Sequence, residues 1–129
     1  MAGNDGLTAA NIRYLLTVKA LDKDGSGVRC VDVAAALGLS KASVHNMMQT
    51  FTRLGLVNKV AYGMAVVTER GNAAAQRYSR YYTAVERLLH SSFPGLENLQ
   101  AAACSLLATV PQQELEQLCV RQQAAAGVN

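Results

Sequence analysis

The sequence has few of the residues that build a disulfide framework, a zinc site or a catalytic triad. Its 129 residues include three cysteines and two histidines. The cysteines are widely spaced and form no CxxC pair (Cys30, Cys104, Cys119). We therefore expect reduced thiols, as in the cytosol, rather than disulfides or a zinc knuckle. Neither His45 nor His90 has a serine or cysteine partner in a motif, which argues against a catalytic triad.

Long hydrophobic runs are also absent. The longest apolar stretch without charge, around Leu99 to Val110, is far shorter than the ~20 residues that a bilayer requires. The first residues, MAGNDG, lack the basic and apolar regions of a secretory signal. The chain is half hydrophobic and only 16% charged, which excludes disorder. We expect a cytoplasmic protein without membrane association, with one domain or a small domain and an appendage.

The charge that is present is unevenly distributed. Residues 41–90 hold seven basic and two acidic residues, a net charge of +5, whereas the rest of the chain has a net charge of −2. An electropositive middle is a mild indication of an anionic partner. A solvated surface is the alternative explanation.

The N-terminal third predicts two helices joined by a turn. Residues 8–21 have apolar positions at mostly helical spacing, with Thr8 as a possible N-cap. A second, short helix is expected from Val31 to Leu37, ended by Gly38 in the left-handed conformation. Between them, DKDGSG (residues 22–27) matches the first half of an EF-hand calcium loop, but the twelfth position is Val33 instead of glutamate. A tight turn is the preferred interpretation, and a calcium loop is the alternative.

The clearest signal is the segment from Ser40 to Leu54. Ser40 is a natural N-cap and Gly55 a natural stop. One apolar stripe runs along the expected helix (Val44, Met47, Met48, Phe51, Leu54). The remaining positions are rich in hydrogen-bond donors and include no acid (Lys41, Ser43, His45, Asn46, Gln49, Thr50, Arg53). Ordinary surface helices mix glutamate and lysine, so this face is unusual.

After Gly55 the hydrophobic period changes from 3.6 to 2. Two short strands, residues 56–60 and 64–68, are expected around a hairpin turn at residues 61–63. Thr68 is expected to cap a long helix that runs to about His90, with one apolar face (Ala74, Tyr78, Tyr81, Val85, Leu88, Leu89). Residues 96–110 predict a nearly uncharged helix, and Pro111 opens a last helix to about Val120, followed by a frayed tail.

Together these elements predict a mainly α fold with a small β-hairpin wing. Residues 1–70 form a winged helix-turn-helix DNA-binding domain in this interpretation, and residues 71–129 form helices that make a homodimer. The helix of residues 40–54 would enter the major groove of double-stranded DNA, with the wing at residues 57–68. The expected DNA contacts are Ser40, Lys41, Ala42, Ser43, His45, Asn46, Gln49, Thr50, Arg53, Lys59 and Tyr62.

Each of these residue types suits a particular contact. Asn46 is suited to a bidentate contact with adenine, and His45 or Gln49 to neighbouring base edges. The basic side chains in the set (Lys41, Arg53, Lys59) suit phosphates, and the small residues Ala42 and Ser43 allow close approach to the groove. A plain helical hairpin with a solvated polar face is the structural alternative.

The run VRCVDVAAALGLSKASVHNMMQTFTRLGLVNKVAYGMAVVTERG resembles the DNA-binding half of the diphtheria-toxin-repressor and manganese-transport-repressor family. YLLTVKAL (residues 14–21) is similar to the first helix of that family, and QRYSRYYTAVERLL and AACSLLATVPQQELEQL resemble its dimerisation helices. The resemblance covers roughly residues 8–120. Several bacterial repressor families share the helix-turn-helix outline, and the flanking helices favour this one.

The resemblance implies Fe(II) or Mn(II) as cofactor, but most ligand positions differ here. Arg13 and Leu16 stand at the first-helix positions, and Tyr82, or Tyr81 after a one-residue shift, stands at the histidine position of the long helix. The family also has a cysteine or glutamate three residues before a glutamate-histidine pair. Cys104 stands at the first of these positions and is a weak candidate ligand, whereas Leu107 and Ala108 replace the pair. Such side chains do not suit these cations. No cofactor is therefore predicted, and metal sensing is expected to be lost or altered.

The resulting hypothesis is a transcription regulator, expected to be a repressor, without enzymatic activity. The alternative is a winged-helix protein-interaction module that does not bind DNA specifically. Three alternatives for its control stay open. The protein binds DNA constitutively, it responds to another small ligand, or it binds metal through differently aligned residues. Cys104 is expected to be an inert buried thiol, with a redox sensor as the alternative. The three tyrosines of the long helix (Tyr78, Tyr81, Tyr82) are expected in core or dimer packing rather than an aromatic cage.

Overall fold

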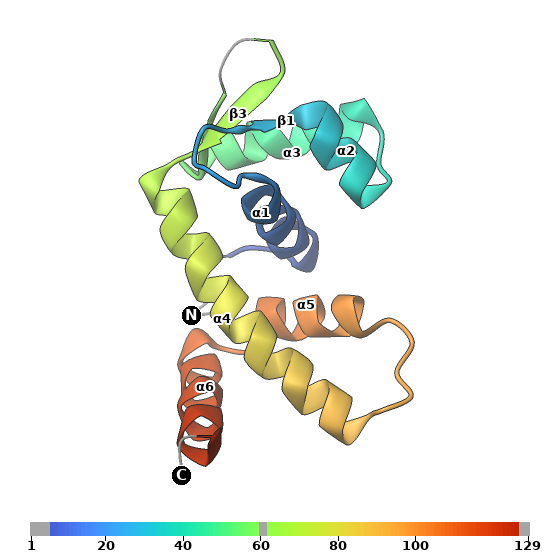
Figure 1. Ribbon diagram of the computed structural model, residues 1–129, viewed down its shortest axis with the longest axis vertical. Helices are drawn as coiled ribbons and strands as arrows, with labels where there is room; N and C mark the ends of the chain where they lie inside the picture. The colour runs from blue at the N-terminus through green and yellow to red at the C-terminus, as the bar shows by residue number, and fades with distance from the viewer. Residues whose placement is uncertain (1–5, 60–61, 127–129) are drawn as a thin grey trace. The chain divides into compact units, whose positions relative to one another are not determined.

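The computed structural model describes residues 6–59 and 62–126, without the side chain of Lys59. Its elements follow the chain as shown in Figure 1. They are α1 (Ala9–Leu21), β1 (Val28–Arg29), α2 (Cys30–Leu37), α3 (Lys41–Arg53), β2 (Val57–Lys59), β3 (Met64–Val67), α4 (Glu69–Ser92), α5 (Leu99–Thr109) and α6 (Gln112–Ala126). This is the mainly α, winged helix-turn-helix fold expected from the sequence.

The chain forms two compact units. Residues 13–76 make up the first, which we call the winged unit. The described parts of residues 1–12 and 77–129 make up the second, which we call the helical unit. The sequence-based boundary between residues 70 and 71 lies inside the continuous helix α4. It stays a prediction that residues before this boundary contact DNA and that residues after it form the dimer.

The core of the winged unit is built from the apolar stripe of α3 and its neighbours. Val44, Met48 and Phe51 are fully buried. The ring of Tyr14 on α1 meets that of Phe51 edge-on, with centroids 6.5 Å apart. The buried stripe ends earlier than expected, because Leu54, its last predicted member, is 37% exposed. Burial of these large side chains is the main stabilising contribution to the unit.

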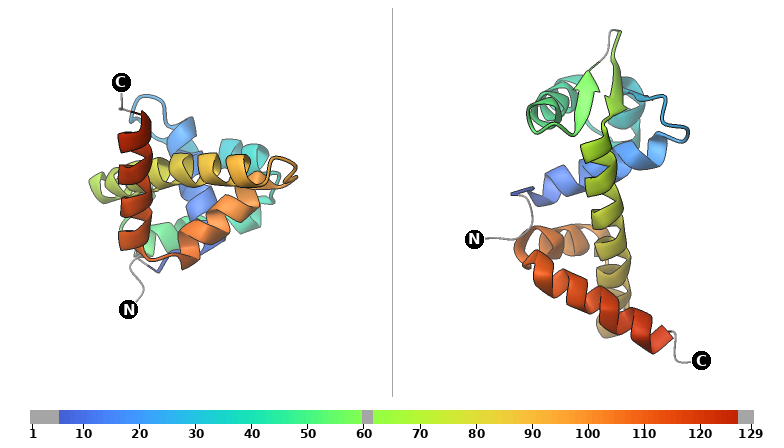
Figure 2. Two further views of the ribbon diagram at one scale, coloured as in Figure 1. Left: turned by 90° about the horizontal axis from the view of Figure 1, so that it is seen from below. Right: turned by 90° about the vertical axis from the view of Figure 1, so that its left-hand side faces the viewer.

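The sheet has one strand more than the sequence predicts. Its order is β1-β3-β2, with both neighbouring pairs antiparallel. The expected hairpin is present, with Val57 opposite Val67 and Asn58 opposite Val66. The missed strand, β1, pairs Val28 with Ala65. In Figure 2 the hairpin projects from the helices of its unit and continues into α4. Residue 60, predicted to end the first strand, and residue 61 of the predicted turn lie outside the described residues.

The predicted helix caps are confirmed. The Thr8 hydroxyl accepts a hydrogen bond from the Asn11 amide at 3.0 Å, and the Ser40 hydroxyl accepts one from the Ser43 amide at 3.1 Å. Gly38 ends α2 with φ of 66°. The Thr68 hydroxyl accepts from the Gly71 amide. These caps satisfy backbone groups that helix ends leave without partners.

The start of α4 packs tightly against the wing. A Cβ atom placed on Gly71 would meet the carbonyl oxygen of Leu56 and come within 2.8 Å of the Val67 side chain. The Thr68 hydroxyl also donates to the Gly55 carbonyl at 2.6 Å. Only glycine fits at residue 71 without displacing the wing.

In the helical unit, α5 and α6 lie beside the C-terminal part of α4 (Figure 2). The expected apolar face of α4 is largely confirmed, but Leu88 is 43% exposed. The buried side chains of this unit include Leu7 and Ile12 and residues from all three helices (Tyr78, Tyr81, Val85, Leu89, Cys104, Leu107, Leu115, Cys119). Among the described residues, no helix is both long and apolar enough to cross a membrane.

Two predicted helix boundaries were wrong. The helix expected from residue 96 begins at Leu99, because the Asn98 side chain accepts from the Ala101 amide and caps it there. The last helix does not end near Val120 but continues to Ala126. Glutamine and alanine are good helix formers, which accounts for the extension through QQAAA.

Candidate nucleic-acid interface

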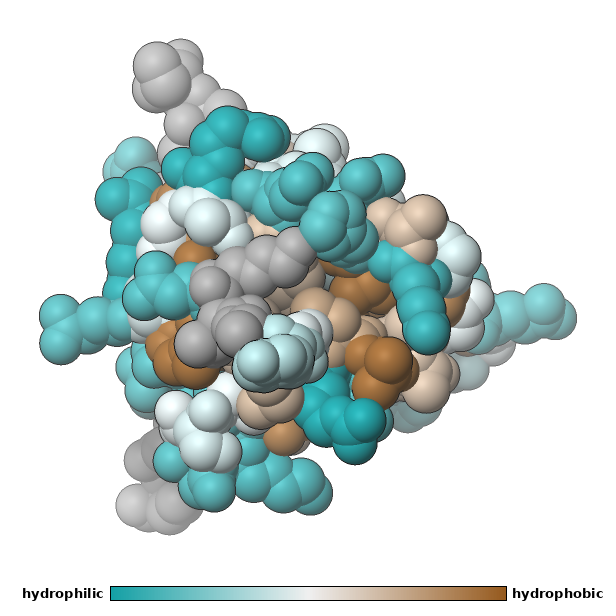
Figure 3. Space-filling view, turned by 90° about the horizontal axis from the view of Figure 1, so that it is seen from above, coloured by the Kyte–Doolittle hydropathy of each residue, from teal (hydrophilic) through white to brown (hydrophobic). Residues whose placement is uncertain are grey.

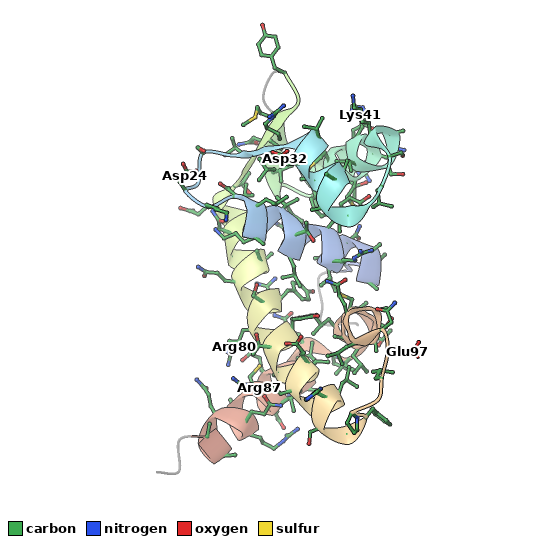
Figure 4. The ribbon with its side chains drawn as sticks, turned by 45° about the vertical axis from the view of Figure 1, so that its right-hand side comes forward. Asp24, Asp32, Lys41, Arg80, Arg87 and Glu97 are labelled. Atoms are coloured by element: carbon green, nitrogen blue, oxygen red, sulfur yellow. The ribbon has the colours of Figure 1, made fainter. Side chains whose placement is uncertain are left out.

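The polar face of α3 is accessible, as expected from the sequence. Of the residues expected to contact DNA on this helix and its cap, Thr50 is half-buried and the others are exposed (Ser40, Lys41, Ala42, Ser43, His45, Asn46, Gln49, Arg53). Figure 4 labels Lys41 at the start of the helix. In the view onto the wing in Figure 3, hydrophilic residues surround smaller hydrophobic areas. The structure therefore presents these side chains on one solvent-facing helix.

Some polar side chains of α3 form hydrogen bonds within the protein, and others do not. The Thr50 hydroxyl donates to the Asn46 carbonyl at 3.2 Å and accepts from Arg53 Nη2 at 3.5 Å. Ser40 and Ser43 bond to each other at the cap. Within the described residues, the side-chain amides of Asn46 and Gln49 make no hydrogen bond. These two exposed amides are therefore available to contact another molecule.

The wing turn carries an exposed aromatic side chain. Tyr62 is fully exposed, and its φ of 65° is the only positive value of a non-glycine residue in the described part of the chain. Its neighbour Gly63 has φ of 75°. Lys59 lies at the end of β2, but its side chain is outside the described residues.

A cavity of about 350 Å³ lies between the start of α3 and the wing. It is lined by Cys30 and Val31 of α2, Lys41 and His45 of α3, and Gly63 of the wing. The sequence did not single out Cys30 or Val31 for this site. These two residues reach the site because the short strand β1 pairs with β3 and brings the start of α2 next to the wing.

The winged unit has a net positive charge, and none of its acids lies on α3 itself. Residues 13–76 hold eight basic and four acidic residues, a net charge of +4. Asp22 is buried and accepts from the Gly27 amide at 3.2 Å. The Ser26 hydroxyl and amide both donate to Asp24, and these bonds hold the pKa of Asp24 below its usual range. The loop of residues 22–27 thus uses its carboxylates to form a tight turn, as preferred from the sequence.

Few cation-binding groups occur among the residues that the sequence resemblance places at metal-ligand positions. Cys104 is buried and Leu107 is fully buried, both on α5. Burial raises the pKa of Tyr82, and the nearby Glu86 and Cys104 raise it further. In the part of the chain that the structure describes, no three His, Cys, Asp or Glu side chains cluster as a metal site would require.

Comparisons with known proteins agree on the fold. Residues 6–61, somewhat less than half of the chain, match the model of the IclR helix-turn-helix domain. The structure of the manganese regulator SloR superposes with a TM-score of 0.72 at 19% identity, covering 95% of this chain and 55% of SloR. The structure of T. acidophilum IdeR gives a TM-score of 0.66 at 18% identity, covering 86% of this chain and 53% of IdeR.

A third structure is similar over nearly its whole length. The hypothetical protein SSo2273 from Sulfolobus solfataricus has a TM-score of 0.62 at 21% identity, covering 95% of this chain and 92% of that protein. The chain therefore spans about half the length of IdeR and SloR but most of SSo2273. No match was found among curated protein sequences. These likenesses establish a winged helix-turn-helix fold.

Proposed function

We propose that this chain is a transcription regulator that binds double-stranded DNA through the winged unit, with α3 in the major groove. The observation that carries the proposal is the exposed face of α3, which is rich in donors and has no acid. A helix of this size fits the major groove, where side-chain donors and acceptors distinguish base pairs. The helix-turn-helix match over residues 6–61 supports the same function.

The exposed residues divide by the chemistry of their contacts. Asn46 and Gln49 contact base edges, because their amides are exposed, and His45 contacts an adjacent edge. Lys41, Arg53 and Lys59 contact phosphates, which position the protein without reading the sequence. Tyr62 contacts DNA from the wing, and the small residues Ser40, Ala42 and Ser43 admit the helix to the groove.

The finer assignment follows the resemblance to the diphtheria-toxin-repressor family. IdeR, SloR and a structure described as ScaR with bound Zn²⁺ share the fold of this chain. We propose a cytoplasmic, non-enzymatic repressor of this type whose residues 71–129 make a homodimer. Large hydrophobic side chains of this region are exposed in the single chain (Leu88, Phe93, Leu96, Val120). A two-fold mate would cover them and set two α3 helices about one DNA turn apart, roughly 34 Å.

Light scattering of the full chain tests the dimer. At micromolar concentration we expect twice the mass of the 13.7 kDa chain. A folded monomer under these conditions would refute the dimer but leave DNA binding by the winged unit intact.

Fluorescence anisotropy with labelled genomic fragments tests DNA binding. The logarithm of affinity should fall linearly with the logarithm of salt concentration, by roughly 0.9 for each phosphate neutralised. Lys41→Ala should make this slope shallower by about one. Arg121→Ala, on α6 of the helical unit, is the control and should leave it unchanged. Absence of binding to any fragment, or affinity independent of salt, contradicts the proposal.

A protein-interaction module is the second candidate, favoured by exposed hydrophobic residues near α3. Val31 is 41% exposed and Leu39 is 39% exposed, and Val31 lines the cavity beside α3. A protein partner would bury these side chains and bind with weak salt dependence. Binding to a protein with weak salt dependence, together with no DNA binding, would establish this alternative.

A further inference from the structure

Polar contacts join α6 to α4 at several places in the helical unit. Arg80 Nη1 donates to both carboxylate oxygens of Glu116, at 2.8 and 2.9 Å. The Tyr81 hydroxyl donates to Glu116 Oε2 at 2.6 Å. Further along α6, the Gln122 side chain donates to the Ala84 carbonyl at 2.8 Å. The two helices are therefore held in a defined register along this side of α4.

A cavity of about 260 Å³ lies between the two helices. Its α4 wall follows one helical face, with residues at the first, fourth, fifth and eighth positions (Arg80, Thr83, Ala84, Arg87). Its α6 wall repeats the pattern over one turn (Cys119, Gln122, Gln123). Figure 4 shows Arg80 and Arg87 along the same flank of α4.

The lining is unusual in its balance of donors and acceptors. It contains two guanidinium groups and two side-chain amides but no carboxylate. Arg80 shares its charge with Glu116, whereas Arg87 is exposed and forms no ion pair within the described residues. The cavity thus retains an uncompensated positive charge next to neutral hydrogen-bonding groups. An arginine fork binds carboxylates and phosphates with two parallel hydrogen bonds.

We propose that the cavity between α4 and α6 binds a small organic anion that carries a carboxylate or phosphate group. Arg87 contacts the oxyanion, Arg80 adds positive charge on the same wall, and Gln123 contacts the uncharged part of the ligand. The apolar surface of Ala84 and Cys119 contacts the ligand's carbon skeleton. This site is independent of DNA binding, since every lining residue belongs to the helical unit.

Isothermal titration calorimetry of the full chain tests the site at constant ionic strength in chloride. The probes are succinate and inorganic phosphate, with neutral succinamide as the matched control for succinate. We expect at least one anion to bind once per chain with a Kd of about 1 mM or tighter, and succinamide not to bind. The two anions separate a carboxylate site from a phosphate site.

Variants at exposed arginines locate the binding. Arg87→Gln should weaken the anion about tenfold or more, the effect of losing a charged hydrogen bond. Arg121→Gln removes the same charge from α6 outside the cavity and should leave the Kd unchanged. Circular dichroism checks that both variants keep the helices.

Three results would overturn the proposal. These are no saturable binding of either anion up to about 10 mM, equal binding of succinamide, or equal weakening by the two variants. Equal weakening would mean that net charge, and not this cavity, attracts the anion. None of these results depends on DNA, so failure here is distinguishable from failure of the proposed function.

Discussion

The backbone amide of Cys30 donates to the carbonyl of Gly63 at 2.8 Å. This bond joins the first residue of α2 to the wing turn, and the β1–β3 pairing continues the connection toward Val28 and Ala65. The wing strand β3 therefore pairs with β1 on one side and with β2 on the other. Cys30, Lys41 and Gly63 consequently border one cavity on the face proposed to bind DNA.

The accessibility of Cys30 provides a footprint of bound DNA. Cys30 is half-buried, whereas Cys104 and Cys119 are buried, so a maleimide should label Cys30 first. Added DNA should slow this labelling in proportion to the fraction of protein that is bound, because the duplex would cover the cavity. Peptide mass spectrometry identifies the site, and Cys30→Ser should lack the rapid reaction. Unchanged labelling of a demonstrably DNA-bound protein would place the duplex elsewhere.

Asn46 and Lys41 should contribute to DNA binding in different ways. Asn46→Ala should cost about 1–3 kcal/mol on a specific site and relax the preference at one base pair. Lys41→Ala should weaken all sequences alike, because a phosphate contact carries no base information. Affinities on the preferred site and its single-base variants distinguish the two effects. If Asn46→Ala weakened the affinity for all of these sites equally, Asn46 would not contact a base.

Much of this site was predictable because its signals are local. The α3 stripe and the Ser40 cap follow from spacing and residue type within one helix, and Val44, Met48 and Phe51 are buried as expected. The role of Thr50 was less visible. Its hydroxyl bonds to the carbonyl of Asn46 one turn earlier, a competition that sequence patterning does not show.

The missed features depend on contacts between distant segments. Strand β1 is only two residues long and has no periodicity of its own, and its pairing partner β3 lies more than thirty residues later. The cavity beside Cys30 exists only because this pairing forms. Similarly, the polar contacts between α4 and α6 join residues 35 to 39 positions apart, such as Tyr81 to Glu116 and Cys119 to Arg80. Hydrophobic periodicity indicates that such helices pack but not which polar groups meet.

Gly71→Ala should destabilise the winged unit. The added methyl group would meet the Leu56 carbonyl oxygen and the Val67 side chain, so the wing or the start of α4 would have to shift. Overpacking of this kind costs about 1–3 kcal/mol. Gly95→Ala is the control, because a Cβ there meets nothing within 4 Å. Urea unfolding measures both variants, and equal free energies of unfolding would disprove the close contact at Gly71.

The bond between Tyr81 and Glu116 should make stability depend on pH in acid. Hydrogen bonds from Tyr81 and Arg80 lower the pKa of Glu116 in the folded protein. A lowered pKa stabilises the fold above the ordinary glutamate pKa, and this contribution is lost as the pH falls through the folded pKa. Tyr81→Phe removes the larger of the two causes. The free energy of unfolding of this variant should therefore decline less than that of the wild type below about pH 4.3.

Tyr82→Phe is the matched control for this measurement, since no hydrogen bond from Tyr82 to Glu116 is present in the described residues. Its acid dependence should equal that of the wild type. At the alkaline end, burial and the Glu116 carboxylate raise the pKa of Tyr81 to about 12. Titration by absorbance should show this phenol ionising later than a free tyrosine. Identical acid profiles for Tyr81→Phe and the wild type would contradict the assignment.

DNA binding should not require a divalent metal. In the correspondence drawn from the sequence, Leu107 and Ala108 replace the glutamate-histidine pair of the family that this chain resembles, and Leu107 is fully buried. Arg13 adds a positive charge at another ligand position. Fe(II) and Mn(II) need several oxygen or nitrogen ligands at fixed geometry, which a thiol and a tyrosine do not provide. We therefore expect DNA binding that is constitutive or that responds to a ligand of another class, with metal bound through differently aligned residues as the remaining alternative.

Calorimetry with Mn(II) and Fe(II) should therefore show no specific site tighter than about 100 µM, equivalent to roughly 5.5 kcal/mol. DNA affinity should be the same with and without EDTA. Cys104→Ala is an internal check, because Cys104 is the one retained ligand candidate, and the variant should bind DNA as the wild type does. If EDTA abolished binding and Mn(II) restored it, the correspondence drawn for residues 13, 16, 82, 107 and 108 would be wrong. Loss of that restoration in Cys104→Ala would then identify Cys104 as a ligand.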